Sequence, residues 1–340
     1  MKERINWIDW SKFMAITLVV IGHLPMEPGN PVHVYINCFH MPFFMFLSGY
    51  LTKRSDSFTK NLKKDWTGII LPFLLYNAVL YPYAMAKSYT VGVPISFTNY
   101  VLNPFLGVTT LSLFHGLING PTWFLVALFF SRIVLDFSNR LKYKYTFLVI
   151  ISTLFFIFYE VNEYYVFTEK LVLIGFARCL PYFLLGKLLQ GKIVASKCQY
   201  RLLLSATIVT GVASIGASLF LYDISIFFIR IQVLQLICIC AIIFFTCISL
   251  LFNSIKLIFV VNISIGTLVI FGLHWACIGC FNQLFQCIFG IDQIKYEMWQ
   301  VLLLAVLIEV ILYPLIKSLP PMWLGKRKEI VAQIRYKRKP

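Results

Sequence analysis

Charged residues are scarce in this chain of 340 residues, and acidic residues are the scarcest among them. Asp, Glu, Lys and Arg together make up 13% of the sequence, compared with about 25% in soluble domains. Hydrophobic residues account for 59%. A soluble protein of this length could not cover so much apolar surface with so few charges. The composition therefore excludes a soluble globular protein.

The sequence signatures of several enzyme classes are also missing. The chain has no glycine-rich nucleotide-binding loop, zinc signature or serine-hydrolase elbow. Its nine cysteines give no pairing framework, and we predict no metal site. The basic, apolar N-terminus lacks an Ala-x-Ala-type cleavage site, so we expect it to be retained as a first membrane span. With no bound cofactor expected, a reactive group must arrive with a small-molecule donor.

The apolar residues form long continuous runs, without the alternation of barrel strands. Such runs predict an all-α, polytopic helical membrane protein with about ten transmembrane helices. Within the long connection 87–121, we predict a short interfacial or re-entrant segment at about 105–117. The predicted spans are about 5–24, 32–52, 66–86, 122–136, 145–158, 171–189, 202–222, 226–252, 257–277 and 299–316.

The formal net charge of +16 is distributed unevenly along the chain. If the N-terminus is cytoplasmic and the spans alternate, twenty-five of the thirty basic residues lie in cytoplasmic segments. This is the positive-inside pattern, and it predicts a multi-pass protein of the cell (cytoplasmic) membrane with both termini in the cytoplasm. We expect a transmembrane domain, 1–317, and a basic tail, 318–340. The pattern favours membrane lipid, and not nucleic acid, as a partner.

Two ionisable residues share one face of the first predicted span. Lys12 and His23 are eleven residues apart, which is close to three helical turns and about 16 Å along the axis. Ionisable residues inside a membrane helix are costly and usually functional. We interpret Lys12 as a cation at the cytoplasmic mouth of a cavity. Asp9 precedes it by three positions and can pair with it; alternatively, both residues anchor the helix at the head-group level.

Histidines gather around the outer half of the membrane. The second span contains Asn37 and His40, three positions apart and therefore on one face. A short turn joins the first two spans, so we expect them to pack as an antiparallel pair. Histidine can accept and return a proton near neutral pH. The catalytic candidates are His23, Lys12, His40 and Asn37, and the remaining histidines are His33, His115 and His274.

Arg178, Arg230 and Glu309 also fall within predicted spans, away from their cytoplasmic ends. The sequence does not pair them. Arg178 joins Lys12 as a candidate for binding the donor; the alternative is an intramembrane ion pair with an unidentified acid. Arg230 lies near the outer boundary and can snorkel. We interpret the small residues at Ser48-Gly49-Tyr50 as a helix-packing site, with a functional motif as the alternative.

Five segments of the chain form a recognisable set: Asn6-Trp7-Ile8-Asp9, Lys12-x10-His23, Phe39 to Tyr50, Pro121 to Leu125, and Ile263-Ser264-Ile265-Gly266 to His274. Together they resemble acyltransferase family 3, membrane acyltransferases that include the polysaccharide O-acetylases. The resemblance runs nearly end to end, and the first fifty residues are its specific part. That family typically has ten spans and a basic residue-x10-histidine motif in the first, with Arg more familiar than the Lys of this chain.

The resemblance implies a cytoplasmic acyl-CoA donor, most often acetyl-CoA, and a carbohydrate acceptor, a sugar hydroxyl of an envelope or surface glycan. Basic residues of the inner loops could then hold the CoA phosphates. One alternative is a proton-coupled small-molecule transporter, but the chain lacks the pair of broken helices expected from inverted repeats. A non-catalytic scaffold, the other alternative, would not explain Lys12 and His23 on one face.

Overall fold

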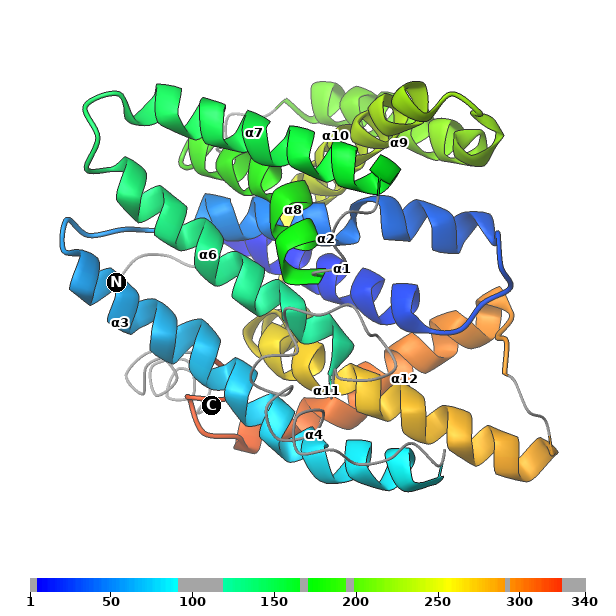
Figure 1. Ribbon diagram of the computed structural model, residues 1–340. Coiled ribbons are helices and arrows are strands. Elements are labelled where there is room, and N and C mark those ends of the chain that lie inside the picture. The colour runs from blue at the N-terminus through cyan, green and yellow to red at the C-terminus, as the bar shows by residue number, and fades with distance from the viewer. Residues whose placement is uncertain (1–4, 91–118, 166–170, 194–198, 291–293, 326–340) are drawn as a thin grey trace. The chain divides into compact units, whose positions relative to one another are not determined.

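The computed structural model describes residues 5–90, 119–165, 171–193, 199–290 and 294–325 (Figure 1). Across these ranges the chain is helical and contains no β-strand, which confirms the all-α prediction. Eight of the described helices are long and apolar enough to cross a membrane. The protein is therefore a multi-pass helical membrane protein.

Each of the ten predicted spans falls on a helix of its own. The third is a continuous run of α3 (Phe58–Asp65), a π-helical turn (Trp66–Ile70) and α4 (Leu71–Thr90). The others are α1 (Asn6–His23), α2 (Pro31–Leu51), α6 (Trp123–Ser138), α7 (Lys144–Tyr165), α8 (Leu171–Leu188), α9 (Tyr200–Leu219), α10 (Phe227–Leu251), α11 (Ile258–Phe289) and α12 (Met298–Ser318).

Some predicted helix ends are wrong. The Ser57 hydroxyl accepts a hydrogen bond from the Lys60 backbone N–H at 3.3 Å, so α3 begins at Phe58, eight residues before the predicted start of the third span at Trp66. α7 continues to Tyr165, which places Glu160 and Glu163 on a helix instead of in a loop. A capping side chain or a continuing backbone ladder sets a helix end, whereas apolar content reports only the part suited to the membrane.

The ninth span is the largest such error, because α11 continues twelve residues beyond the predicted end at Cys277, to Phe289. It stops at Gly290, which has a left-handed φ of +64°. Glycine adopts this conformation without the penalty that a Cβ brings, and it is a common helix terminator. The predicted interfacial segment 105–117 and most of the predicted tail 318–340 lie outside the described residues.

The chain divides into two compact units, and each is described here by itself. The first comprises 1–52, 181–267 and 280–311; the second comprises 53–180, 268–279 and 312–340. Helices α8, α11 and α12 each contribute residues to both units.

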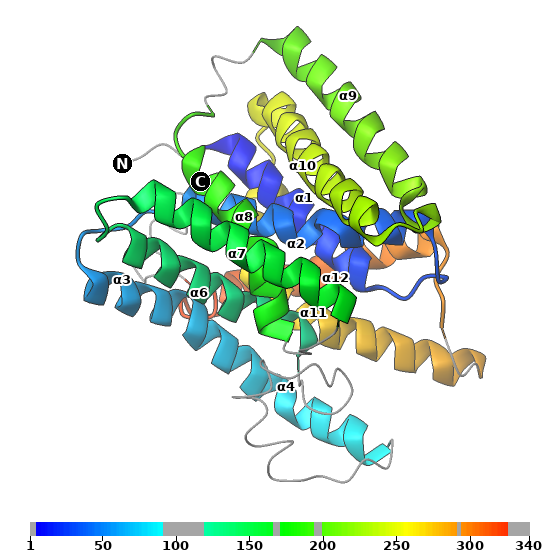
Figure 2. The same cartoon turned by 45° about the horizontal axis from the view of Figure 1, so that its top comes forward.

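In the first unit, α1 packs against α2 and α10, and α9 lies beside α10 (Figure 2). The N-terminal end of α1 is fixed to the end of α10. The Asn6 side chain donates to the Asn253 carbonyl at 2.6 Å, and the Trp7 N–H donates to the Asn253 side chain at 3.0 Å. Deeper along the pair, the Ser11 hydroxyl donates to Ser249 Oγ at 2.7 Å. These bonds set the rotation of α1, and therefore the direction in which its polar face points.

Helices α2 and α8 meet at two reciprocal glycines within the first unit. A Cβ on Gly49 would lie 1.9 Å from the carbonyl oxygen of Phe183, and one on Gly186 would lie 2.0 Å from that of Phe46. Only glycine allows the two backbones to approach so closely. The packing interpretation of Ser48-Gly49-Tyr50 is therefore confirmed for Gly49.

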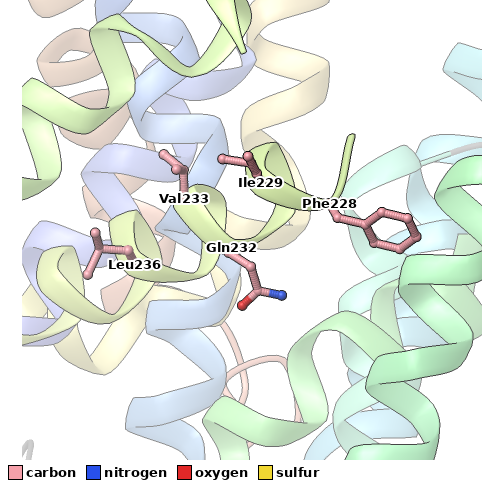
Figure 3. Close-up of a pocket in the computed structure, with 5 residues that line it drawn as sticks. All are labelled: Phe228, Ile229, Gln232, Val233 and Leu236. Atoms are coloured by element: carbon pink, nitrogen blue, oxygen red, sulfur yellow. The ribbon is translucent and has the colours of Figure 1, made fainter. Parts of the chain in front are cut away.

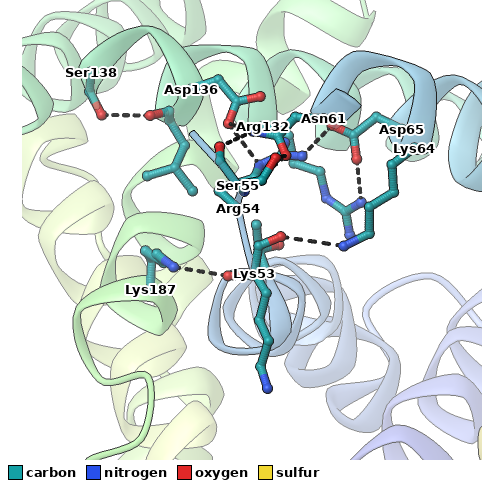
Figure 4. A network of polar contacts seen from close by, with 12 residues as sticks. Lys53, Arg54, Ser55, Asn61, Lys64, Asp65, Arg132, Asp136, Ser138 and Lys187 are labelled. Atoms are coloured by element: carbon teal, nitrogen blue, oxygen red, sulfur yellow. Dashed lines mark hydrogen bonds and ion pairs between the residues drawn. The ribbon is translucent and has the colours of Figure 1, made fainter. Parts of the chain in front are cut away.

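The second unit contains a buried cluster of two arginines and two aspartates (Figure 4). Arg132 contacts Asp65 at 2.8 Å, and Arg54 reaches both Asp65 and Asp136, the latter at 3.1 Å. The Asn61 amide also donates to Asp136 at 3.1 Å. The cluster joins the loop after α2 to α3 and α6. Arg54 is therefore held by carboxylates, unlike the exposed lysines of α3.

Candidate active site

Helix α1 carries both residues of the Lys12-x10-His23 pattern. It is a single α-helix from Asn6 to His23, with both side chains half-buried. An unbroken helix keeps the two residues on one face, about 16 Å apart along the axis at about 1.5 Å per residue. The predicted geometry of this pair is confirmed.

The imidazole of His23 is oriented by its own helix. Its Nδ1 lies 2.7 Å from the carbonyl oxygen of Val19. A carbonyl oxygen can only accept, so Nδ1 must carry the hydrogen of this bond. In the neutral ring the lone pair is then on Nε2. His23 therefore offers Nε2 as the nitrogen that can take up a proton.

His40 lies beside His23, as the antiparallel arrangement of the first two spans predicts. The ring centroids are 6.0 Å apart, and the ring planes are nearly perpendicular at 85°. His40 is buried, and its Nδ1 lies 2.8 Å from the Ile36 carbonyl oxygen. The same reasoning places its lone pair on Nε2. Two histidines with the same tautomer thus meet where α1 ends.

Gly22 lets α2 approach the last turn of α1. A Cβ at this position would lie 3.1 Å from the side chain of Ile36 and 3.4 Å from the amide oxygen of Asn37. His33, one helical turn before Asn37, has its Nε2 3.0 Å from the Gly22 carbonyl oxygen. Polar side chains at 33, 37 and 40 thus form one face of α2 toward the Gly22-His23 end of α1. The sequence did not indicate the contact made by His33.

The turn between α1 and α2 is held by the segment that precedes α12. The Tyr296 N–H donates to the Pro25 carbonyl at 2.8 Å, and Lys295 forms an exposed ion pair with Glu27 at 2.9 Å. The Tyr296 hydroxyl donates to Asn282 of α11 at 2.7 Å. Burial raises the pKa of Tyr296 above its ordinary value of 10.0, so its phenol keeps its proton near neutral pH. The two hydrogen bonds of Tyr296 steady the chain immediately after His23.

In the first turn of α1, Asp9 is buried and accepts a hydrogen bond from the Ser264 hydroxyl of α11 at 2.6 Å. This contact favours a packed position over the head-group anchor considered as an alternative. Further along α1, the Thr17 hydroxyl donates to buried Glu309 of α12 at 2.6 Å. The sequence could not pair Glu309. Both carboxylates fix α1 to helices far away in the chain.

The two predicted donor-binding residues are not joined within either unit. Lys12 belongs to the first unit and Arg178 to the second. The guanidinium of half-buried Arg178 lies 6.0 Å from the ring centroid of Tyr159, at the limit of a cation–π contact. Arg230 is exposed, and its guanidinium lies 5.8 Å from the Phe227 ring centroid.

The second unit holds another buried histidine, His274, whose Nδ1 lies 3.0 Å from both the Ile270 and Phe271 carbonyl oxygens. Sequence reasoning missed Asn119, which is also buried and donates to the Gly272 carbonyl at 2.7 Å. Its position two residues before the Pro121-Thr122-Trp123 segment was the available signal. His115 lies outside the described residues.

A groove on the first turns of α10 contains none of the predicted site residues (Figure 3). Gln232 is its single polar lining side chain, and the others are Phe228, Ile229, Val233 and Leu236. In the described part of the chain, no three His, Cys, Asp or Glu side chains come together as a metal site would require. The candidate reaction site is therefore the group of polar side chains where α2 packs against the C-terminal end of α1: His23, His33, Asn37 and His40.

These features define a polytopic membrane protein with a paired-histidine site between its first two helices. The family model for an acyltransferase domain matches residues 5–317, so the chain belongs to acyltransferase family 3. The nodulation protein NolL of Mesorhizobium japonicum (strain LMG 29417 / CECT 9101 / MAFF 303099) is 32% identical over 149 residues. That match covers 39% of this chain and 36% of NolL. No solved structure matches the chain.

Proposed function

We propose that this protein transfers an acyl group from cytoplasmic acyl-CoA to a sugar hydroxyl of an envelope or surface glycan, with acetyl as the favoured acyl group. It works in the cell membrane, surrounded by lipid, with both termini in the cytoplasm. The observation that carries the proposal is the oriented His23 imidazole. It presents a basic Nε2 at one end of a helix whose other end holds Lys12.

The chemistry needs a base because a hydroxyl is a poor nucleophile at neutral pH. As the acceptor oxygen attacks the thioester carbonyl, a C–O bond forms and the C–S bond breaks. His23 Nε2 takes the hydroxyl proton and returns it to the departing CoA sulfur, so the reaction is balanced in protons. A positioned base is typically worth about a hundred- to ten-thousand-fold in rate. Asn37 and His40 are the candidates to orient the base or the acceptor.

Lys12 supports the same reaction from the cytoplasmic end. Its ammonium can bind a phosphate of the donor or polarise the thioester carbonyl. The pantetheine arm of CoA is long and thin, which suits the separation between Lys12 and His23. Arg178 is proposed as a second donor-binding cation.

The test is acyl transfer by purified protein in lipid nanodiscs. Release of free CoA thiol and labelling of a glycan acceptor are followed with labelled acetyl-CoA. His23→Ala should abolish detectable transfer while the protein still inserts and folds. Lys295→Ala is the matched control, because it removes only an exposed ion pair near the same turn; it should transfer at the wild-type rate.

Other outcomes assign the site differently. A trapped acyl-enzyme, formed without acceptor, would make His23 the carrier of the acyl group instead of its base. Near-normal transfer by His23→Ala would refute both roles and direct the search to His40 or His274. Uptake of a solute into vesicles without thiol release would favour the transporter.

A further inference from the structure

The last turn of α1 has a carbonyl group that its own helix cannot satisfy. A helix leaves its final four C=O groups without intrahelical donors. At this terminus the Leu24 N–H donates to the Ile21 carbonyl at 3.2 Å. The Gly22 carbonyl instead lies 3.0 Å from His33 Nε2, on the first turn of α2. A side chain of the next helix thus caps the end of α1.

This bond acts on the peptide group that leads into His23. The Gly22 carbonyl carbon is bonded to the backbone nitrogen of His23, and the peptide unit between them is planar. The hydrogen bond to the carbonyl oxygen therefore fixes the orientation of this peptide plane, which contains the backbone nitrogen and Cα of His23. The absence of a Gly22 side chain lets α2 come close enough for the contact.

His33 is itself held firmly. Asn30 caps α2: its side-chain oxygen accepts from the Val32 N–H at 3.0 Å and from the His33 N–H at 3.2 Å. Pro31 occupies the first position of the helix, which presets its backbone. The chain from Asn30 to His33 therefore forms a fixed support from which the imidazole reaches across to Gly22.

We propose that His33 is a positioning residue for acyl transfer: its Nε2–H bond to the Gly22 carbonyl aims the His23 imidazole at the acceptor hydroxyl. The proposal rests on the proposed function of His23. A carbonyl only accepts, so Nε2 of His33 carries hydrogen and is committed to this bond, and in the neutral ring the lone pair is on Nδ1. His33 acts through His23 and does not take part in the bond changes.

A pair of substitutions isolates this bond. In His33→Gln, the side-chain amide nitrogen replaces Nε2 as a donor; in His33→Leu, bulk remains but the donor is lost. A misplacement of 1 Å can cost about a hundredfold in rate, so we expect kcat to fall about ten- to a hundredfold in His33→Leu. The KM for acyl-CoA should stay within about twofold, since donor binding is unaffected. His33→Gln should keep most of the wild-type kcat.

The other kinetic outcomes contradict the proposal. If Gln and Leu are equally inactive, His33 has a chemical role of its own; if both are fully active, the bond is irrelevant. If His33→Leu does not insert, His33→Met tests the same loss of a donor.

A readout that needs no enzymatic activity separates this inference from the proposed function. Hydrogen–deuterium exchange of the wild-type protein and both variants in nanodiscs reports fraying at the end of α1. Exchange at the Leu24 amide should accelerate in His33→Leu and not in His33→Gln. If exchange at this amide is unchanged in His33→Leu, His33 does not position His23, even if the protein is an active transferase. If the wild-type protein shows no acyl transfer while exchange is faster in His33→Leu, the proposed function is refuted and the structural role of the His33 bond is not.

Discussion

Replacing Gly49 by alanine should separate α2 from α8. The added Cβ would lie 1.9 Å from the Phe183 carbonyl oxygen, whereas ordinary contact begins near 3.4 Å, so the helices must part by about 1.5 Å. The obstacle is a main-chain atom, which cannot rotate away as a side chain does. We expect destabilisation of about 3 kcal/mol, the upper end of the usual cost of overpacking.

The assay is thermal unfolding of detergent-solubilised protein, followed by size-exclusion chromatography. Gly216→Ala on α9 is the matched control, because a Cβ there meets nothing within 4 Å. It should leave stability unchanged or slightly raised. Gly186→Ala should resemble Gly49→Ala, and the double variant should lose less than the sum, since the first substitution already parts the helices. If Gly49→Ala unfolds at the same temperature as Gly216→Ala, the close backbone contact does not exist.

Three further predictions address topology, the donor and the ion cluster. Reporter fusions at Lys339 and Glu163 should report cytoplasm and exterior respectively; the opposite result at either site would overturn the ten-span topology. Lys12→Ala should weaken acyl-CoA use and Lys12→Arg should retain much of it, as steady-state kinetics on folded protein will show; unchanged kinetics in Lys12→Ala would remove Lys12 from the donor site. Arg54→Ala should cost about 3–5 kcal/mol by leaving buried carboxylate charge uncompensated, whereas exposed Lys60→Ala should not alter thermal stability; equal unfolding temperatures for the two would contradict the cluster.

Much of the fold could be predicted from the sequence because a lipid bilayer restricts the choice. A spanning segment must satisfy its backbone hydrogen bonds internally, so each long apolar run predicts a helix. The fixed helical repeat then places Lys12 and His23 on one face without further information. The ends of α7 and α11 were not predictable in this way, because polar residues interrupt both apolar runs before the helices end: Glu160 and Glu163 in α7, and Asn282, Gln283 and Gln286 in α11. Their termini depend on backbone bonds and, in α11, on the left-handed Gly290.

The sequence by itself therefore determined the class of fold, the succession of helices and the residues that share a helix face, because these follow from short-range periodicity and composition. Only the tertiary structure decided which faces meet. It pairs Asp9 with Ser264, 255 positions away, and Thr17 with Glu309, 292 positions away. It also turns His33 toward the carbonyl of Gly22. Such contacts depend on the rotation and close approach of whole helices, and no local pattern specifies them.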